Sequence, residues 1–516
     1  MMIGRLLLVA QLVFRGLAQE LQPLASGPDA FHGEAYDHEA AALLQVHRDG
    51  VLEEGHHHEK EACAPLANKG SMFTVKVGVG SPVQTFNLVA DTGSNALIVP
   101  SCICQEHGHC KSGGKCYATD TNSSSFKLYV SGKPKQVVQQ VVNFGSGGIA
   151  AIVAQATVKI SNLSAVMKKG LLLMVEQALR FNTTNFEGIL GLGPPLPKAS
   201  TFAAATKAQD RVLKAFPKGV GTVDAHGKAP ACDSFLEQAG IKRFSMCFNG
   251  GSDGVLRFGG RAHQNALPSI GDYHWGVGLE SISVGEGHAT QKLKVCSKDT
   301  MELGQETPCA VLPDSGSTML MGPAEHVTQL MESICDGWER CSASKGLTGD
   351  DNLDEDPTIS PKTRRVNELL ADCESWLDSG DGLSEMPPIQ FHIGGGGAVG
   401  QVLKLEAEDY VFKLGAKGCK AAIAPVSFST KHNGPVWILG LPLFFGYRVS
   451  YDLQPPSVGF TSSKDIPCGV CGQKKAEFGI NLAATTVGLG SRARLQRSPW
   501  EMFGPPRMPT FIDGHL

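Results

Sequence analysis

The sequence predicts an all-β protein built from two similar lobes. Two short segments, at 86–94 and 310–317, each consist of an apolar run that ends in Asp, a hydroxyl residue, Gly and Ser. Each is followed, after a long stretch, by Ile-Leu-Gly, first at 189–191 and again at 438–440. The 61 glycines of this 516-residue chain favour turn-rich β structure over a helical bundle. The repeated order predicts an internal duplication with pseudo-twofold symmetry.

Each of these Asp boxes is expected to place a carboxylate where a buried strand ends in a tight loop. The two carboxylates are Asp91 and Asp314. Brought together they share one proton, because two neighbouring carboxylates cannot both ionise cheaply. Such a pair can activate water, since one member takes a proton from water while the other donates one to a carbonyl oxygen. A single Asp-Thr-Gly or Asp-Ser-Gly is often an ordinary turn, but two copies in matched surroundings favour a site.

Around these boxes the chain resembles the pepsin-like aspartic proteases, from about residue 65 to about residue 463. The segments that carry the resemblance occur in the family's order, at 73–82, 86–94, 143–148, 244–260, 310–317 and 458–460. The resemblance implies a bilobal fold that hydrolyses peptide bonds, with Asp91 and Asp314 as the catalytic pair. It also implies supporting roles for the neighbouring loop residues, namely Thr92, Gly93, Ser94, Ser315, Gly316 and Ser317. Among these, Thr92 and Ser315 would lock the two loops together.

The same resemblance places a substrate-covering flap at Phe144, Gly145 and Ser146, with Ile98 facing it. The family usually has Tyr at the position of Phe144 and often Trp at that of Ile98, and those side chains share a hydrogen bond. Both residues are apolar here, so no buried donor is left unpaired. Their character predicts a preference for apolar residues near the cut.

The cysteines indicate an oxidising compartment. There are fifteen, an odd number, so at least one is unpaired or bonded to another chain. The resemblance implies bridges between Cys296 and Cys309 and between Cys373 and Cys419, while the spacing of Cys335 and Cys341 allows a local loop. The Cys-x-x-Cys pair at 468–471 is interpreted as a terminal bridge, with exchange to Cys63 as an alternative.

A Cys-rich insertion follows the first Asp box. It contains Cys102, Cys104, Cys110 and Cys116 with two intervening histidines. We favour disulfides over zinc, because the spacing is not that of a paired zinc motif and thiolate ligation is less expected in an exported chain. The insertion is similar to those of the nepenthesin and plasmepsin V types.

Five segments are predicted along the chain. A positive start, a short apolar core and small residues predict a signal peptide at 1–18. A His-rich propeptide at 19–64 would precede an N-terminal lobe at 65–244, a C-terminal lobe at 245–463 and a disordered tail at 464–516. The predicted location is the secretory pathway, ending outside the cell or in an acidic lysosome- or vacuole-like compartment. Three sequons are glycosylation candidates, at Asn122, Asn162 and Asn182.

Two insertions lie in the body of the protein, at 198–228 and 342–385. The second is rich in acidic residues and glycine, and its pattern predicts a short helix at 365–377. Its acidic run lacks the regular ligand spacing of a calcium loop. Both insertions are candidates for the rim of the cleft.

Composition excludes several other functions. The net charge of −4 and the absence of a basic patch before the tail argue against nucleic acid, and no later apolar stretch is long enough to span a membrane. We expect a monomer that acts on polypeptides without a cofactor or metal. Two alternatives are an inactive relative that only binds peptides or inhibits another enzyme, and a metallohydrolase that uses the Cys-rich insertion. The second would be sensitive to chelators and indifferent to loss of Asp314.

Overall fold

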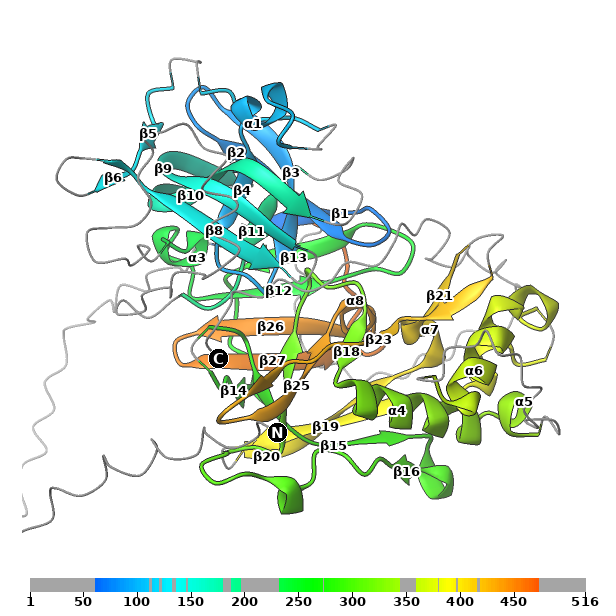
Figure 1. Ribbon diagram of the computed structural model, residues 1–516. Coiled ribbons are helices and arrows are strands. Elements are labelled where there is room, and N and C mark those ends of the chain that lie inside the picture. Colours follow the sequence, from blue (N-terminus) through cyan, green and yellow to red (C-terminus); the bar gives the residue numbers. More distant parts are fainter. Residues whose placement is uncertain are drawn as a thin grey trace, which may run out of the picture. The chain divides into compact units, whose positions relative to one another are not determined.

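The computed structural model describes twelve segments of the chain: 61–110, 114–119, 123–131, 136–144, 147–179, 187–195, 232–271, 273–343, 359–378, 380–395, 398–414 and 418–472. All of them fall within one compact unit, His58–Leu516 (Figure 1). The predicted signal peptide, nearly all of the predicted propeptide and the 198–228 insertion lie outside the described residues.

Two large β-sheets dominate the described residues, which confirms the predicted all-β class (Figure 1). The first has 14 strands: β1 (Ala62–Asn68), β2 (Phe73–Val79), β3 (Gln84–Asp91), β4 (Leu97–Pro100), β5 (Lys127–Leu128), β8 (Gln139–Phe144), β9 (Gly147–Ile160), β10 (Leu163–Leu179), β11 (Ile189–Gly191), β12 (Arg243–Cys247), β13 (Gly254–Phe258), β14 (Leu267–Pro268), β26 (Tyr447–Leu453) and β27 (Pro456–Ser462). The second has nine: β15 (Val277–Val284), β16 (Gln291–Lys292), β17 (Cys309–Pro313), β18 (Leu320–Gly322), β19 (Ile389–Gly395), β20 (Ala398–Leu405), β23 (Ile423–Pro425), β24 (Ser429–Thr430) and β25 (Gly434–Leu439). Because β26 and β27 join the first sheet, that sheet takes strands from both ends of the body of the chain.

The remaining elements are short. Two small ribbons pair β6 (Val130–Ser131) with β7 (Gln136–Val137) and β21 (Val411–Lys413) with β22 (Cys419–Ala421). The described α-helices are α1 (Cys102–Glu106), α3 (Phe235–Gln238), α4 (Ala324–Gly337), α5 (Glu339–Ser342), α6 (Pro361–Ala371), α7 (Ala407–Tyr410) and α8 (Leu441–Gly446). Single 3-10 turns occur at η1 (Gly287–Ala289), η2 (Lys298–Thr300), η3 (Cys373–Ser375) and η4 (Gly382–Glu385).

One four-strand arrangement occurs twice, once in each sheet. In the first sheet, β3 runs parallel to β11, β11 pairs antiparallel with β4, and β4 runs parallel to β10. In the second sheet, β17, β25, β18 and β23 repeat the same sequence of directions. In both, the Ile-Leu-Gly strand lies directly beside the strand that leads into an Asp box. The duplication seen in the sequence is therefore a duplication of strand pairing.

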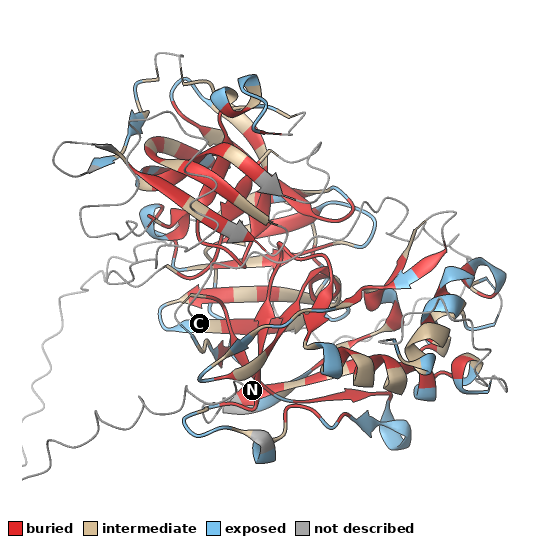
Figure 2. Cartoon of the chain, viewed as in Figure 1, coloured by how far each residue is buried: buried red, intermediate tan, exposed pale blue. Residues whose placement is uncertain are grey.

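The burial pattern along each strand reflects how many of its faces are covered. In β2, Val75, Val77 and Val79 are buried while Lys76 is exposed, which is the period of a strand with one face in the core. In β17 every residue is buried, as expected for a central strand covered on both faces. Figure 2 shows this burial continuing through the strands of both sheets.

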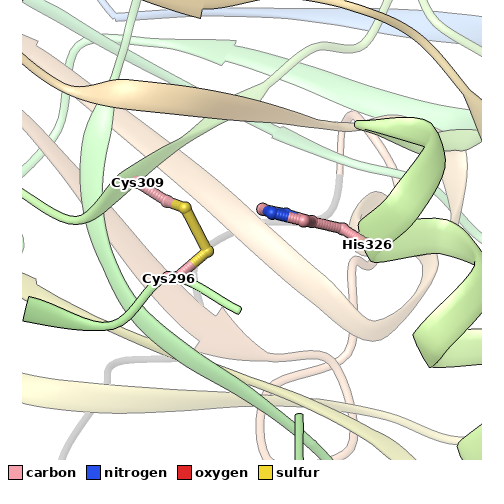
Figure 3. Close-up of side chains that lie close together, drawn as sticks. All are labelled: Cys296, Cys309 and His326. Atoms are coloured by element: carbon pink, nitrogen blue, oxygen red, sulfur yellow. A yellow bond between two sulfur atoms is a disulfide. The ribbon is translucent and has the colours of Figure 1, made fainter. Parts of the chain in front are cut away.

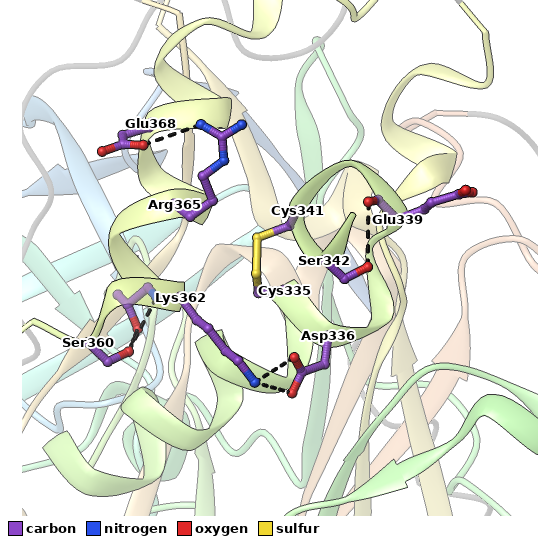
Figure 4. Close-up of a disulfide and its surroundings, with 10 residues drawn as sticks. Cys335, Asp336, Glu339, Cys341, Ser342, Ser360, Lys362, Arg365 and Glu368 are labelled. Atoms are coloured by element: carbon purple, nitrogen blue, oxygen red, sulfur yellow. Dashed lines mark hydrogen bonds and ion pairs between the residues drawn. A yellow bond between two sulfur atoms is a disulfide. The ribbon is translucent and has the colours of Figure 1, made fainter. Parts of the chain in front are cut away.

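The described part of the acidic insertion contributes helix α6, which packs beside the preceding helix α4 (Figure 4). Helix α4 buries Val327, Leu330 and Ile334 on one face, and contacts α5 and α6. The disulfide Cys335–Cys341 fastens α5 to α4. Lys362 Nζ on α6 donates to the carboxylate of Asp336 at 2.7 Å.

The predicted helix at 365–377 is displaced in the structure. Helix α6 runs from Pro361 to Ala371 and is followed by the 3-10 turn η3. It begins earlier because the Ser360 hydroxyl accepts a hydrogen bond from Thr363 N, and because proline is well tolerated in the first turn. The cap chemistry, rather than the apolar period, decides where this helix starts.

Two long-range disulfides fasten the described end of the predicted tail, 464–472, to the sheet. Cys471 pairs with Cys63 on β1, and Cys468 pairs with Cys247 on β12. The expected bridge between Cys468 and Cys471 is therefore wrong, and the alternative partner Cys63 is the one found. The guanidinium of Arg257, on β13, lies between them and donates to the backbone carbonyl of Cys468 at 2.9 Å.

We predict that the Cys63–Cys471 bridge contributes more stability than the Cys335–Cys341 bridge. The first joins residues 408 positions apart and the second residues 6 apart, and a longer closed loop removes more entropy from the unfolded chain. Replacing Cys63 and Cys471 together by Ser should lower the free energy of unfolding by about 2–4 kcal/mol in urea titrations without reductant. The matched Cys335→Ser, Cys341→Ser pair should lose less, and equal losses would contradict this prediction.

Candidate active site

Both Asp boxes lie where the first strand of each duplicated arrangement, β3 or β17, ends. Strand β3 ends at Asp91 and β17 ends one residue before Asp314. The Asp91 backbone carbonyl accepts a hydrogen bond from Leu192 N at 2.7 Å, and Asp314 N donates to Leu439 O at 3.0 Å. The two residues are only 2% and 3% exposed. A residue in the second Ile-Leu-Gly segment, and one directly after the first, therefore fix the backbones of the two Asp residues.

The two carboxylates have matching hydrogen-bond partners. Gly93 N donates to Asp91 Oδ1 at 3.0 Å, and Ser94 Oγ donates to Asp91 Oδ2 at 2.7 Å. In the second loop, Gly316 N donates to Asp314 Oδ1 at 2.8 Å, and Ser317 Oγ donates to Asp314 Oδ2 at 2.5 Å. These donors orient each carboxylate and offset part of the cost of its burial.

The two loops bring the carboxylates face to face. A Cβ atom added to Gly93 would lie 2.6 Å from Asp314 Oδ1, and one added to Gly316 would collide with the carboxylate of Asp91. Each glycine therefore leaves room for the carboxylate of the opposite loop, and no residue with a side chain fits at either position without a shift. The structure thus places Asp91 and Asp314 together, as the paired boxes predict.

The hydroxyl residues after each Asp join the loops through four reciprocal hydrogen bonds. Thr92 Oγ1 donates to Pro313 O at 2.9 Å and accepts from Ser315 N at 3.0 Å. Ser315 Oγ donates to Ala90 O at 2.8 Å and accepts from Thr92 N at 3.0 Å. All four are buried, where backbone groups without partners would be costly.

The environment of Asp314 favours its protonated form. Burial raises the pKa of Asp314 well above its ordinary value, and the negative charge of Asp91 raises it further. The hydrogen bonds from Ser317 and Gly316 oppose this shift, because they stabilise the carboxylate. The pair therefore holds a proton at a pH where an isolated Asp would have lost it.

Three side chains beside the loops were not predicted from the sequence. The Tyr451 hydroxyl donates to Pro313 O at 3.3 Å and lies 3.4 Å from Thr92 Oγ1. Trp275 Nε1 donates to Leu192 O at 2.8 Å. Burial lowers the pKa of the neighbouring His274 to about 4, and the negative charge of Asp91 opposes that shift. No motif marks these residues, because their role depends on strands that are distant in sequence.

Phe144 and Ile98 belong to one apolar cluster. Phe144 ends β8, opposite Gly147 of β9, and is 8% exposed. It shares a cluster of buried residues with Ile98, Val142 and Ile149. The other two predicted flap residues, Gly145 and Ser146, lie outside the described residues.

The four cysteines of the Cys-rich insertion are all bonded to one another. Cys102 pairs with Cys116 and Cys104 with Cys110, so none of them offers a thiolate to a metal in this oxidised state. The metallohydrolase alternative loses its proposed ligands. Among the described cysteines, Cys232 is the one without a disulfide, and it is buried.

Cys296, Cys309 and His326 also lie within 4.8 Å of one another (Figure 3). The two sulfurs form a disulfide, and the ring of His326 accepts a hydrogen bond from Trp437 Nε1 at 3.3 Å. This group is therefore a bridge packed beside a histidine. The predicted pairs Cys335–Cys341 and Cys373–Cys419 are also bonded in the structure.

Of the three sequons, Asn162 is described. It is exposed in the turn between β9 and β10, and its side-chain amide donates to Glu61 O at 3.3 Å. Asn122 and Asn182 lie outside the described residues.

Comparison with known proteins decides the family. The family model described as eukaryotic aspartyl protease matches residues 72–463. The chain belongs to the eukaryotic aspartyl protease family. It is an aspartic-type endopeptidase, and its substrates are polypeptides.

Three relatives of this aspartyl protease show how low the sequence identity is. Renin of Echis ocellatus is 23% identical over 81% of this chain and 87% of its own length. Cathepsin D of Chionodraco hamatus is 24% identical over 75% and 80%, and gastricsin of Macaca fuscata fuscata is 24% identical over 77% and 86%. No helix among the described residues is long and apolar enough to cross a membrane.

We predict that Thr92→Val destabilises the protease while Thr92→Ser does not. Valine keeps the volume but leaves Ser315 N without its acceptor, a loss of about 2–3 kcal/mol in the free energy of unfolding. Serine keeps the hydroxyl, and the expected loss is below about 1 kcal/mol. Urea unfolding of the three proteins at one pH measures this difference, and similar stabilities of the Val and Ser variants would show that the hydroxyl is not needed.

Proposed function

We propose that Asp91 and Asp314 form the catalytic dyad and hydrolyse peptide bonds by activating one water molecule. The observation that carries this proposal is the placement of each loop's glycine against the opposite carboxylate, which sets the two carboxyl groups across one small space. The ionised member takes a proton from water as it attacks the peptide carbonyl, and the protonated member donates to the carbonyl oxygen. No covalent acyl intermediate forms.

This dyad requires one proton, so its activity should be highest in acid. When both carboxyl groups are protonated, no base remains, and when both are ionised, the acid is lost. The raised pKa of Asp314 supports a proton on the pair through the acidic range. The rate should therefore fall on both sides of an acidic maximum.

Substrate would bind as an extended chain beside the hairpin of β8 and β9, pairing its backbone with strand edges. The apolar cluster that contains Phe144 and Ile98 supports a preference for apolar residues near the cut. Both carboxyl groups come from one chain, so the proposed site is complete in a monomer. The proposed reaction does not involve nucleic acid.

The covalent structure supports a proposal for the compartment. Seven disulfides among the described residues suit the secretory pathway and an extracellular or acidic lysosome- or vacuole-like destination. We propose the segments 1–18 as signal peptide and 19–64 as propeptide, ahead of the lobes 65–244 and 245–463. Because β1 starts at Ala62 and contains the bonded Cys63, a cut that leaves this strand whole would fall before Ala62, a few residues ahead of the boundary at 64.

The test compares Asp91→Asn and Asp314→Asn with the wild type on a mixed peptide library from acid to neutral pH. Each variant should lose at least about 1,000-fold in kcat/KM, because an amide can act neither as base nor as acid here. Cleavage by the wild type should be strongest in acid and blocked by pepstatin, which binds this family's dyad.

Asp409→Asn is the matched control. Asp409 is half-buried and its pKa is raised to about 7, mainly by desolvation, but it caps α7 by accepting a hydrogen bond from Glu406 N. This variant should keep near wild-type cleavage. Retained activity in either dyad variant would reject the proposed mechanism, and a folded wild type that binds peptides without cutting them would favour the peptide-binding alternative.

A further inference from the structure

The described end of the tail, 464–472, joins two strands that are not neighbours in the sheet. Cys63 on β1 and Cys247 on β12 lie on opposite sides of β13. Strands on either side of a third are about 9–10 Å apart, which is too far for a direct disulfide. The tail therefore spans β13, with Cys471 bonded to the first strand and Cys468 to the second.

The two bridges of the tail differ in their access to solvent. Cys63 and Cys471 are both half-buried, whereas both members of the bridge to β12 are at most 3% exposed. Among the seven bridges of the described residues, Cys102–Cys116 is the other one with two half-buried members. A reducing thiolate must reach a sulfur before it can attack the disulfide. Access therefore leaves two of these seven bridges open to a reductant.

The Cys63–Cys471 bridge has a cation bonded to one sulfur. Arg257 Nη1 donates to Cys63 Sγ at 3.5 Å, and Arg257 Nη2 donates to the Cys468 carbonyl at 2.9 Å. Arg448 Nη2 donates to the carbonyl of Pro467, the preceding residue, also at 2.9 Å. Two guanidinium groups are thus held on consecutive carbonyls of one segment, beside the bridge.

These two guanidinium groups have no carboxylate partner within the described part of the chain. Arg243, on the neighbouring strand β12, pairs with Asp452 at 3.0 Å, but no such pair forms at Arg257 or Arg448. Burial lowers the pKa of both groups, and the charge of Arg257 lowers that of Arg448 further. Two half-buried cations that repel each other are stabilised by an anion placed beside them.

Reduction of the bridge supplies such an anion at Cys63. A cation beside a sulfur favours its thiolate, and a disulfide breaks faster when the leaving sulfur is a stable thiolate. Because Arg257 contacts the sulfur of Cys63, Cys63 is the better leaving group. The attacked sulfur is then that of Cys471. In the described part of the chain, no charged group is hydrogen-bonded to either sulfur of the other half-buried bridge.

We propose that Cys63–Cys471 is a redox site at which a dithiol reduces this protein, with Cys63 as the leaving thiolate and Arg257 as its counter-charge. One thiolate of the dithiol bonds to Cys471 Sγ, and the electron pair of the broken S–S bond goes to Cys63. The second thiol of the dithiol then attacks the mixed disulfide, and its proton ends on Cys471. Two electrons have passed to the protein, and the dithiol has become a disulfide.

Reduction at this site opens one of the two attachments of the tail. The buried bridge between Cys247 and Cys468 remains, so the tail stays on β12 while β1 is released from it. None of these cysteines lies in the two Asp loops, so the loops should keep their hydrogen bonds. The inference goes beyond the proposed dyad, and it can be tested whether or not the chain cuts peptides.

The test follows each cysteine during partial reduction of the folded, oxidised full chain. Limiting dithiothreitol is added at neutral pH, free thiols are trapped with N-ethylmaleimide at intervals, and peptide mass mapping identifies the labelled residues. Cys63 and Cys471 should be labelled at least about tenfold faster than Cys102 and Cys116, the other half-buried pair. Equal rates for the two bridges, or earlier labelling of Cys102–Cys116, would overturn the proposal.

Two substitutions test the guanidinium, since Arg257→Gln removes the charge and Arg257→Lys keeps it. The Gln variant should reduce about three- to tenfold more slowly at this bridge, and the Lys variant should stay within about twofold of wild type. A loosened fold would expose the bridge and speed its reduction, so the expected change is opposite to that of unfolding. Arg261→Gln removes an exposed arginine and is the matched control, with no change expected. An unchanged rate in Arg257→Gln would overturn the role of the guanidinium.

Discussion

Two carboxyl groups buried against each other constrain the rest of this structure. Asp91 and Asp314 are almost excluded from water, and their mutual repulsion and desolvation both oppose ionisation. Such a pair persists only if fixed donors stabilise the charge that remains and if the loops cannot drift apart. Backbone N–H groups and serine hydroxyls supply the donors, and the reciprocal bonds of Thr92 and Ser315 hold the loops.

The duplicated strand arrangement explains why those loops meet. A parallel pairing places each Ile-Leu-Gly strand beside an Asp strand, with Leu190 opposite Ala90 and Ile438 opposite Leu312. The loop that follows each Asp strand is then held by both the Asp strand and the Ile-Leu-Gly strand beside it. The stacked rings of Phe244 and Tyr451, with centroids 4.7 Å apart, form a rigid base close to both loops.

Much of this site could be predicted from the sequence because it is encoded in contiguous residues. The Asp boxes, the Ile-Leu-Gly segments and the loop hydroxyls are local patterns, and the structure brings them together. His274 and Tyr451 carry no local pattern, and only the pairing of distant strands places them near the dyad. The partner of Cys468 was missed for the same reason, and Cys63 was predicted only as an alternative partner in the tail, because both partners lie on strands of the first sheet that are distant in sequence. The start of α6 was misplaced because the Ser360 cap outweighs the apolar period.

The bond between Cys63 and Cys471 has a consequence for cleavage of the chain itself. Any single backbone cut between these two residues leaves one piece that carries Cys63 and another that carries Cys471. Both pieces stay covalently joined as a two-chain molecule. A nicked protein would therefore keep its full mass until a reductant separates its halves, and both Asp boxes would remain in one particle.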